Sequence, residues 1–118
     1  MSVRPLKHPG MASVALTDVL HALADPDRLA IVAALDDART PLNCVETMER
    51  VGRGLPKSTC SQHYVILREA GLIWCERKGV ELESRLRTAE LDRRFPGLLG
   101  SILKAWRLRT TRDPSPSA

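Results

Sequence analysis

The hydrophobic period of this chain changes at Leu72, and that change restricts the fold more than any other feature of the sequence. Residues 57–70 carry apolar side chains at helical spacing, and Gly71 follows where a glycine commonly ends a helix. Past Leu72 the period becomes two, which is typical of a half-buried strand: Val80, Leu82, Ser84 and Leu86 alternate with Glu81, Glu83, Arg85 and Arg87. The sequence therefore predicts a helix followed by a hairpin of strands 73–76 and 80–87, with a turn at 77–79.

The predicted helix over residues 57–70 has two unlike faces. At about 100° per residue, one face gathers the apolar side chains and has His63 on its flank: Cys60, Tyr64, Leu67 and Ala70. The opposite face carries Ser58, Ser61, Gln62, Val65 and Arg68. A helix with this division packs one face into a core and leaves the other to solvent or to a groove.

Three further helices are predicted before residue 57. Apolar residues at positions 16, 19, 20 and 23 form the first, with Ser13 as a candidate N-cap; it stops near Ala24, because the residue before a proline avoids the helical region. Asp25 is a capping residue type, and Pro26 fits the first position of a second helix. A short helix over 44–51 follows and is closed by Gly52.

Apolar residues between 91 and 106 return to helical spacing, with a kink expected at Pro96. We expect a flexible arm over residues 1–12, one domain over 13–109 and a disordered tail over 110–118. The fold class is mainly α with a small β-hairpin, in the order helix, helix, helix, helix, hairpin, helix. A short helix, a glycine-containing connection and a longer helix make a helix-turn-helix, and the hairpin makes its wing. The prediction is a winged helix-turn-helix.

Charge is unevenly distributed along the 118 residues, whose net charge is +4. Residues 1–49 carry four Lys or Arg against seven Asp or Glu, whereas residues 50–87 carry eight against four. A localised basic half is the electrostatic pattern of a nucleic-acid binder. Aromatic residues are only 3% of the chain, which argues against base stacking on single strands. No apolar run is long enough to cross a bilayer and no signal-peptide pattern is present, so we expect a soluble cytoplasmic protein.

Two segments carry a family resemblance. Residues 22–32 read ALADPDRLAIV and resemble the "LADPTRLRIL" signature of ArsR/SmtB-type bacterial repressors. Residues 57–73 read KSTCSQHYVILREAGLI and resemble the recognition helix of that family, "QPTVSRHLKLLREAGLV". The similarity runs from about Leu16 to Ile102 in the same order and spacing. It implies a homodimer built by its terminal helices, which represses an operator and releases it when an inducer, often a metal ion, binds.

The candidate DNA-binding residues lie on the predicted recognition helix, before it and on the wing: Arg53, Lys57, Ser58, Thr59, Ser61, Gln62, His63, Val65, Arg77 and Lys78. Gln62 can pair with adenine through two hydrogen bonds, and Val65 can touch a thymine methyl group. The alternatives are a solvated polar face for the helix, a core-flank position for His63 and a solubilising turn for the wing.

The candidate dimer interface combines apolar residues of the first and last helices: Leu16, Leu20, Leu98, Ile102, Leu103 and Trp106. Two recognition helices would then be about 34 Å apart, and the operator would be an inverted repeat. The alternative is a monomer in which the last helix is an ordinary core helix.

The metal site of the resembling sensors is incomplete in this sequence. Those sensors carry Cys-x-Cys on the short helix, whereas here Glu46 follows Cys44 at the second thiolate position. Their other site uses histidines in the last helix, which has none here: the chain has only His8, His21 and His63. Since a tetrahedral site needs three or four convergent ligands, we expect no metal and no other cofactor. Three cysteines without paired spacing indicate reduced thiols, with Cys44 as the candidate for redox reactivity.

The sequence thus predicts a DNA-binding transcriptional regulator, a homodimeric repressor released from double-stranded operator DNA by an unidentified inducer. We expect no enzyme, because the chain has neither a glycine-rich phosphate loop nor a paired nucleophile and base. Two alternatives stay open: a winged helix that serves as a protein-interaction module without operator binding, and a repressor that senses oxidants through its thiols.

Overall fold

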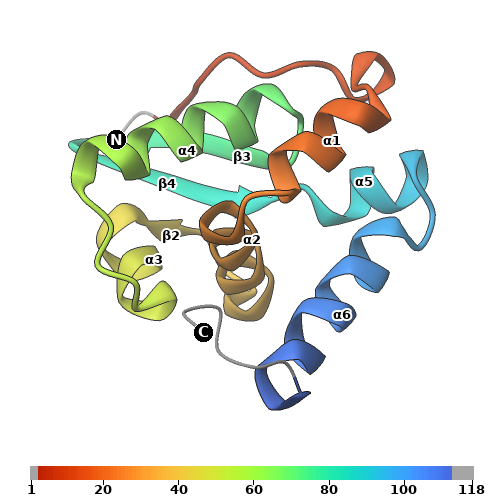
Figure 1. The fold of residues 1–118 in the computed structure, drawn as a ribbon. Helices are drawn as coiled ribbons and strands as arrows, with labels where there is room; N and C mark the ends of the chain where they lie inside the picture. Colours follow the sequence, from red (N-terminus) through yellow and green to blue (C-terminus); the bar gives the residue numbers. More distant parts are fainter. Residues whose placement is uncertain (1–2, 113–118) are drawn as a thin grey trace.

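The computed structural model describes the backbone of residues 3–112 and the side chains of residues 3–109. This part of the chain forms a helical domain with one antiparallel sheet beside it (Figure 1). The helices are α1 (Leu16–Leu23), α2 (Pro26–Ala38), α3 (Cys44–Val51), α4 (Lys57–Glu69), α5 (Thr88–Arg94) and α6 (Leu98–Arg112), with a 3-10 turn at Met11–Ser13. The strands are β1 (Val3–Pro5), β2 (Leu42–Asn43), β3 (Ile73–Lys78) and β4 (Glu81–Leu86), in the spatial order β1-β3-β4-β2. The predicted fold class, a mainly helical winged helix-turn-helix, is confirmed.

The hairpin of β3 and β4 is tighter than the sequence predicted. Lys78 pairs with Glu81, so only Gly79 and Val80 form the turn. Gly79 has φ +61°, and a two-residue turn of this kind requires a positive φ at its first central position. Arg77 and Lys78 therefore complete β3 instead of forming the turn. Val80, which the alternation placed on the buried face, is 97% exposed at the tip.

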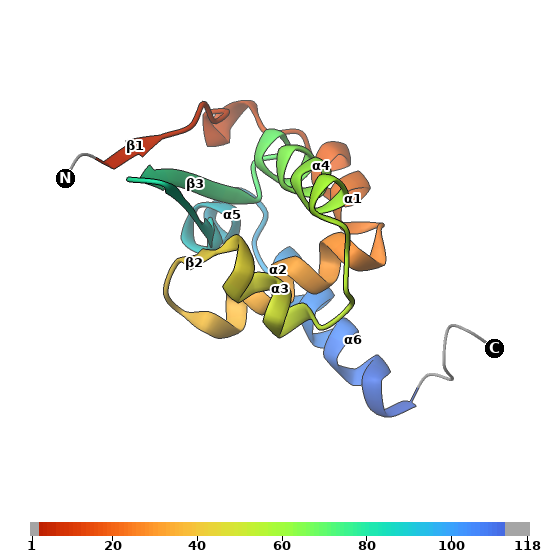
Figure 2. The same ribbon diagram turned by 90° about the vertical axis from the view of Figure 1, so that its left-hand side faces the viewer.

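The predicted flexible arm over residues 1–12 is ordered from residue 3 onward, which corrects that expectation. Strand β1 pairs with the free edge of β3, with Arg4 opposite Arg77 (Figure 2). Further along the arm, Nε2 of His8 accepts a hydrogen bond from the Cys75 backbone N–H (2.9 Å). The His8 ring stacks on Trp74 with the ring centres 3.9 Å apart. The edge of β3 and the face of the Trp74 indole thus hold this segment against the sheet.

The start of α2 follows the expected local chemistry. Pro26 occupies the first turn, and the Asp25 carboxylate accepts hydrogen bonds from the backbone N–H groups of Asp27 (2.8 Å) and Arg28 (3.1 Å). The first helix differs in its start, because Ala15 is the N-cap of α1 and Ser13 ends the preceding 3-10 turn.

Helix α4 packs its apolar face into the core. The four residues predicted to point inward are all buried: Cys60, Tyr64, Leu67 and Ala70. The chain leaves the helix through Gly71, whose φ is +88° and whose α-carbon faces Val14. A Cβ at this position would overlap the Val14 side chain, so both conformation and space require glycine here.

The C-terminal helical segment is divided as expected. Helix α5 ends at Arg94, and α6 begins at Leu98, past Pro96. Helix α6 runs away from the body of the domain in both views (Figures 1 and 2). It continues through residues 110–112 of the predicted tail, and residues 113–118 lie outside the described part. Within residues 3–112, none of the helices has the length and apolar character needed to cross a membrane.

Candidate nucleic-acid interface

Helices α3 and α4 form the helix-turn-helix. A capping box begins α3, because Oδ1 of Asn43 accepts from the Glu46 N–H (2.8 Å) while the Glu46 carboxylate accepts from the Asn43 N–H (2.9 Å). The helix ends at Gly52 in the left-handed conformation, and Pro56 precedes α4. Both ends of the connection are therefore fixed by local geometry, which determines where α4 starts.

The outer face of α4 is polar and free of acidic groups over its first three turns. Five of the predicted DNA-binding residues are exposed there: Lys57, Ser58, Ser61, Gln62 and Val65. Thr59 is half-buried beside them. Amide and hydroxyl side chains can read base edges, and the amides of a helix N-terminus favour a phosphate. The five exposed residues, Lys57, Ser58, Ser61, Gln62 and Val65, are called the α4 face below.

His63 belongs to the predicted DNA-binding set but is buried inside the protein instead of lying on the outer face of α4. Its residue is only 8% exposed and packs between α4 and the start of α2. Its Nδ1 lies 3.4 Å from Nη1 of Arg28, and its Nε2 lies 3.9 Å from a carboxylate oxygen of Asp27. The helical wheel placed His63 on the flank of the apolar face, and the packing turns it inward. The core-flank alternative describes its position, and His63 is left out of the α4 face.

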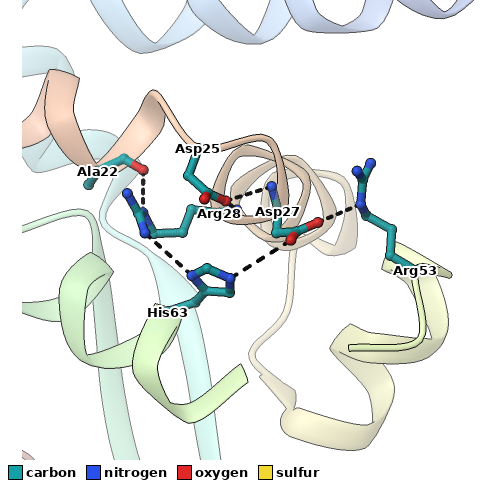
Figure 3. Close-up of polar contacts among 6 residues, drawn as sticks. All are labelled: Ala22, Asp25, Asp27, Arg28, Arg53 and His63. Carbon is teal, nitrogen blue, oxygen red and sulfur yellow. Dashed lines mark hydrogen bonds and ion pairs between the residues drawn. The ribbon is translucent and has the colours of Figure 1, made fainter. Parts of the chain in front are cut away.

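Arg28 joins three helices around His63 (Figure 3). Its guanidinium donates from Nε to the backbone oxygen of Ala22 (2.7 Å) and from Nη2 to that of His21 (3.3 Å), at the end of α1. Nη1 contacts His63 of α4, as described above. Arg28 is 8% exposed, so each of these donors is matched inside the protein. The sequence analysis did not single out Arg28; the signal was its place in the ALADPDR segment.

Arg53 lies in the connection between α3 and α4 and forms an ion pair with Asp27 (Figure 3). The guanidinium is half-exposed, so it is accessible from solvent while it holds the connection against α2. A phosphate at this position would compete with the Asp27 carboxylate. Arg53 therefore fits the predicted DNA-binding set less well than a free surface arginine.

The wing carries the second group of predicted contacts. Arg77 is exposed, and Lys78 pairs with Glu83 (3.2 Å) at the base of the turn. The ordered arm adds Arg4, which is exposed and directly opposite Arg77 on the neighbouring strand. Like charges at opposed positions destabilise a sheet unless an anion compensates them. Arg4, Arg77 and Lys78 are called the wing cluster below. Arg4 was missed because nothing in a three-residue strand signals its pairing.

The three cysteines form no disulfide in the structure and occupy two different environments. Cys75 is fully buried in β3 and accepts a hydrogen bond from the Ser84 hydroxyl (3.1 Å), and burial raises the pKa of its thiol. Cys44, the candidate redox residue, is half-buried, and its Sγ lies 3.4 Å from Sγ of Cys60 on α4.

One group of potential metal ligands occurs in the described part of the chain, where oxygen and nitrogen atoms of Asp25, Asp27 and His63 lie within 4.8 Å of one another. Each of these three side chains already contacts another group of the protein. The guanidinium of Arg28, which can only donate, lies 3.4 Å from Nδ1 of His63. Asp25 caps α2, and Asp27 pairs with Arg53.

The predicted dimer residues divide into three groups. Leu16 and Leu20 are 44% and 42% exposed on α1. Leu98, Ile102 and Trp106 are half-buried on or beside the core. Leu103 is only 2% exposed and belongs to the core of the chain itself, so it is not available at a surface and its predicted interface role is corrected.

A helix-turn-helix with an exposed polar face, followed by a two-stranded wing with a basic edge, defines a winged helix-turn-helix DNA-binding protein.

Comparison with known proteins agrees with that class. Residues 23–75 match a family described as a helix-turn-helix domain. The uncharacterized HTH-type transcriptional regulator YceK of Bacillus subtilis (strain 168) is 32% identical over 84 residues, which are 71% of this chain and 82% of that protein. The chain belongs to the helix-turn-helix transcriptional regulators, in agreement with the class of protein that its two motifs predicted.

Two solved structures share the fold. The transcriptional repressor BigR from Xylella fastidiosa aligns with a TM-score of 0.60 and 23% identity, over 84% of this chain and 87% of that chain. An ArsR family transcriptional regulator aligns with a TM-score of 0.55 and 20% identity, over 81% of this chain and 86% of that chain.

Proposed function

We propose that this DNA-binding regulator acts as a homodimeric repressor in the cytoplasm and binds an inverted-repeat operator in double-stranded DNA. The observation that carries the proposal is the α4 face, an exposed helical surface of small polar residues with Lys57 at its start and no acidic side chain. Such a surface enters a major groove without charge repulsion and offers hydrogen bonds to base edges. An inducer would end repression by weakening this contact.

The two parts of the surface have different tasks in this proposal. The wing cluster neutralises phosphates, which supplies affinity that does not depend on sequence. The α4 face reads bases, with Gln62 as the residue that distinguishes adenine. The amide oxygen of Gln62 accepts a hydrogen bond from adenine N6, and its NH₂ group donates one to N7. Each such pair contributes about 1–3 kcal/mol of discrimination.

Dimerisation rests on the exposed apolar residues of α1 and on α6. Leu16 and Leu20 are large apolar side chains at helical spacing that the chain itself does not cover. Pairing of two chains through α1 and α6 would bury them and space two α4 faces by about 34 Å, one turn of DNA. The name of BigR, a transcriptional repressor, supports repression as the direction of control.

Fluorescence anisotropy with the DNA upstream of the gene for this chain, competed with random duplex over a salt series, tests the proposal. We expect specific binding that weakens steeply with salt. Gln62→Ala should bind with changed base preference at one position of each half-site, while Asp92→Asn, exposed on α5, should bind as the unmodified protein does. Equal weak binding to every duplex would contradict operator recognition and would favour the protein-interaction alternative.

A further inference from the structure

Two thiols meet inside the helix-turn-helix. Cys44 is the first residue of α3 and Cys60 lies in the first turn of α4, and their sulfur atoms are 3.4 Å apart. The pair therefore spans the two helices whose relative position sets the α4 face. The two residues are 16 positions apart in sequence, with the whole connection between α3 and α4 between them.

The two cysteines differ in access. Cys44 is half-buried and can be reached from solvent, whereas Cys60 is 1% exposed. Burial, together with the contact to Cys44, raises the pKa of the Cys60 thiol. Cys75 provides an internal comparison, since it is also buried but has the Ser84 hydroxyl as its recorded partner instead of a second thiol.

We propose that Cys44 and Cys60 are an oxidation site, at which a hydroperoxide produces a disulfide that joins α3 to α4 and weakens DNA binding. The effect on DNA rests on the function proposed above; the disulfide itself does not.

The reaction balances with one hydroperoxide for each disulfide. The sulfur of Cys44, as the thiolate, attacks a peroxide oxygen, the O–O bond breaks, and Cys44 becomes a sulfenic acid while hydroxide leaves and is protonated to water. The sulfur of Cys60 then attacks the Cys44 sulfur, the S–O bond breaks, and the departing hydroxide takes the Cys60 proton to form a second water. Two electrons pass from the two sulfurs to the peroxide. A thiol reductant reverses the bond by exchange.

The disulfide changes the geometry of the helix-turn-helix. An S–S bond is about 2.05 Å long, so the sulfur atoms must approach by more than 1 Å from their 3.4 Å separation. Because Cys60 is rigidly placed in the core at 1% exposure, the shift is transmitted to α3, to α4 or to both. Base-reading side chains need their positions held to about 0.5 Å. Ser61 and Gln62 directly follow Cys60 in α4, so any part of the shift that α4 takes up displaces them from the base edges.

The test uses the full chain, reduced, freed of reductant and treated with hydrogen peroxide. Peptide mapping without reduction identifies the linked cysteines, and anisotropy on the same samples measures affinity for the upstream DNA. We expect a Cys44–Cys60 linked peptide and a loss of affinity of at least about tenfold, equal to one bidentate base contact, which dithiothreitol restores.

Matched variants locate the effect. Cys44→Ser should keep its affinity in peroxide, because a hydroxyl at a half-buried site is tolerated and no disulfide can form. Cys60→Ala should do the same without burying a hydroxyl, and thermal unfolding checks that both variants are folded. Cys75→Ser, which keeps an acceptor for Ser84, should respond to peroxide as the unmodified protein does.

Three outcomes are informative. Absence of the Cys44–Cys60 peptide, or a disulfide that involves Cys75 or a second chain, overturns the oxidation site. A Cys44–Cys60 disulfide with unchanged DNA affinity overturns its control over binding. If the reduced protein does not bind the DNA, the proposed function fails, while the peptide map still decides whether the disulfide forms.

Discussion

Arg28 of α2 and His63 of α4 face each other across the packed helices, with Nη1 of Arg28 3.4 Å from Nδ1 of His63 (Figure 3). The same guanidinium donates to two backbone oxygens at the end of α1. The start of α2, which the ALADPDR segment encodes, therefore determines where the helix with the α4 face lies against α1. Arg28 is therefore a residue that positions α4 against α1 and α2.

Replacement of Arg28 by alanine should lower the free energy of unfolding by about 2–4 kcal/mol, because buried acceptors lose a charged donor. Urea unfolding measures the change. Arg93→Ala is the control, since Arg93 is exposed on α5, and its effect should stay within about 0.5 kcal/mol. Equal stability of the two variants would show that the Arg28 contacts contribute nothing measurable.

Acid should weaken a second connection, between Arg87 at the end of β4 and Glu90 on α5. The Arg87 guanidinium donates to both carboxylate oxygens of Glu90, at 3.1 and 2.9 Å, and to the backbone oxygen of Pro9 (3.0 Å). The hydrogen bonds from Arg87 hold the pKa of Glu90 below its ordinary value of 4.5, although burial opposes them. A carboxyl group with a lowered folded-state pKa stabilises the protein above its unfolded pKa, and this stabilisation is lost as the pH falls through the folded value.

Glu90→Gln should therefore be less stable than the unmodified protein at pH 7, by about 1 kcal/mol for a partly accessible pair. The difference should shrink as the pH falls below 4.5, the ordinary pKa of this group. Urea unfolding at several pH values between about 3 and 7 measures the difference, with Asp92→Asn on the same helix as the control. A difference that is constant over this range would rule out the carboxylate charge as its cause.

The wing cluster should set the salt dependence of DNA binding. Each phosphate that a cation neutralises contributes about 0.9 to the slope of log K against log salt. Alanine at Arg77 and Lys78 should reduce the slope by about 1–2 and weaken binding to all duplexes alike, and adding Arg4→Ala should reduce it by about one more. Anisotropy over a salt series measures the slope, and Arg93→Ala should leave it unchanged. An unchanged slope in the triple variant would remove the wing from the contact surface.

The sequence predicted those parts of the fold that local chemistry determines. The capping of α2 by Asp25 and the bounds of α3 follow from residues within a few positions of each helix end. The inward face of α4 was also predicted, because helical spacing alone decides which of its residues can share a core.

The parts that sequence reasoning missed depend on distant partners. Strand β1 is three residues long and exists because β3 offers an open edge, so no periodicity could indicate it. Arg28 is a charged residue whose burial depends on acceptors from α1 and α4. Leu103 was expected at the dimer interface but is 2% exposed in the core of the chain, and helical spacing alone does not show which apolar residues of α6 the same chain covers.

The exposed leucines of α1 allow a direct test of the dimer. Leu16→Glu with Leu20→Glu places charges on the surface where we expect two chains to pack, and burial of an unpaired charge at an interface is strongly unfavourable. The double variant should elute as a monomer in size exclusion with light scattering, whereas the unmodified protein should elute as a dimer. Both positions are exposed in the chain, so its fold should persist, which circular dichroism checks.

Val45→Glu is the matched control, because Val45 is an exposed apolar residue on α3, outside the expected interface. It should remain a dimer. The monomeric double variant should also lose affinity for an inverted repeat far more than for a single half-site, since only the dimer engages both α4 faces at once. A double variant that stays dimeric would show that α1 is not the interface and would leave α6 as the surface to test next.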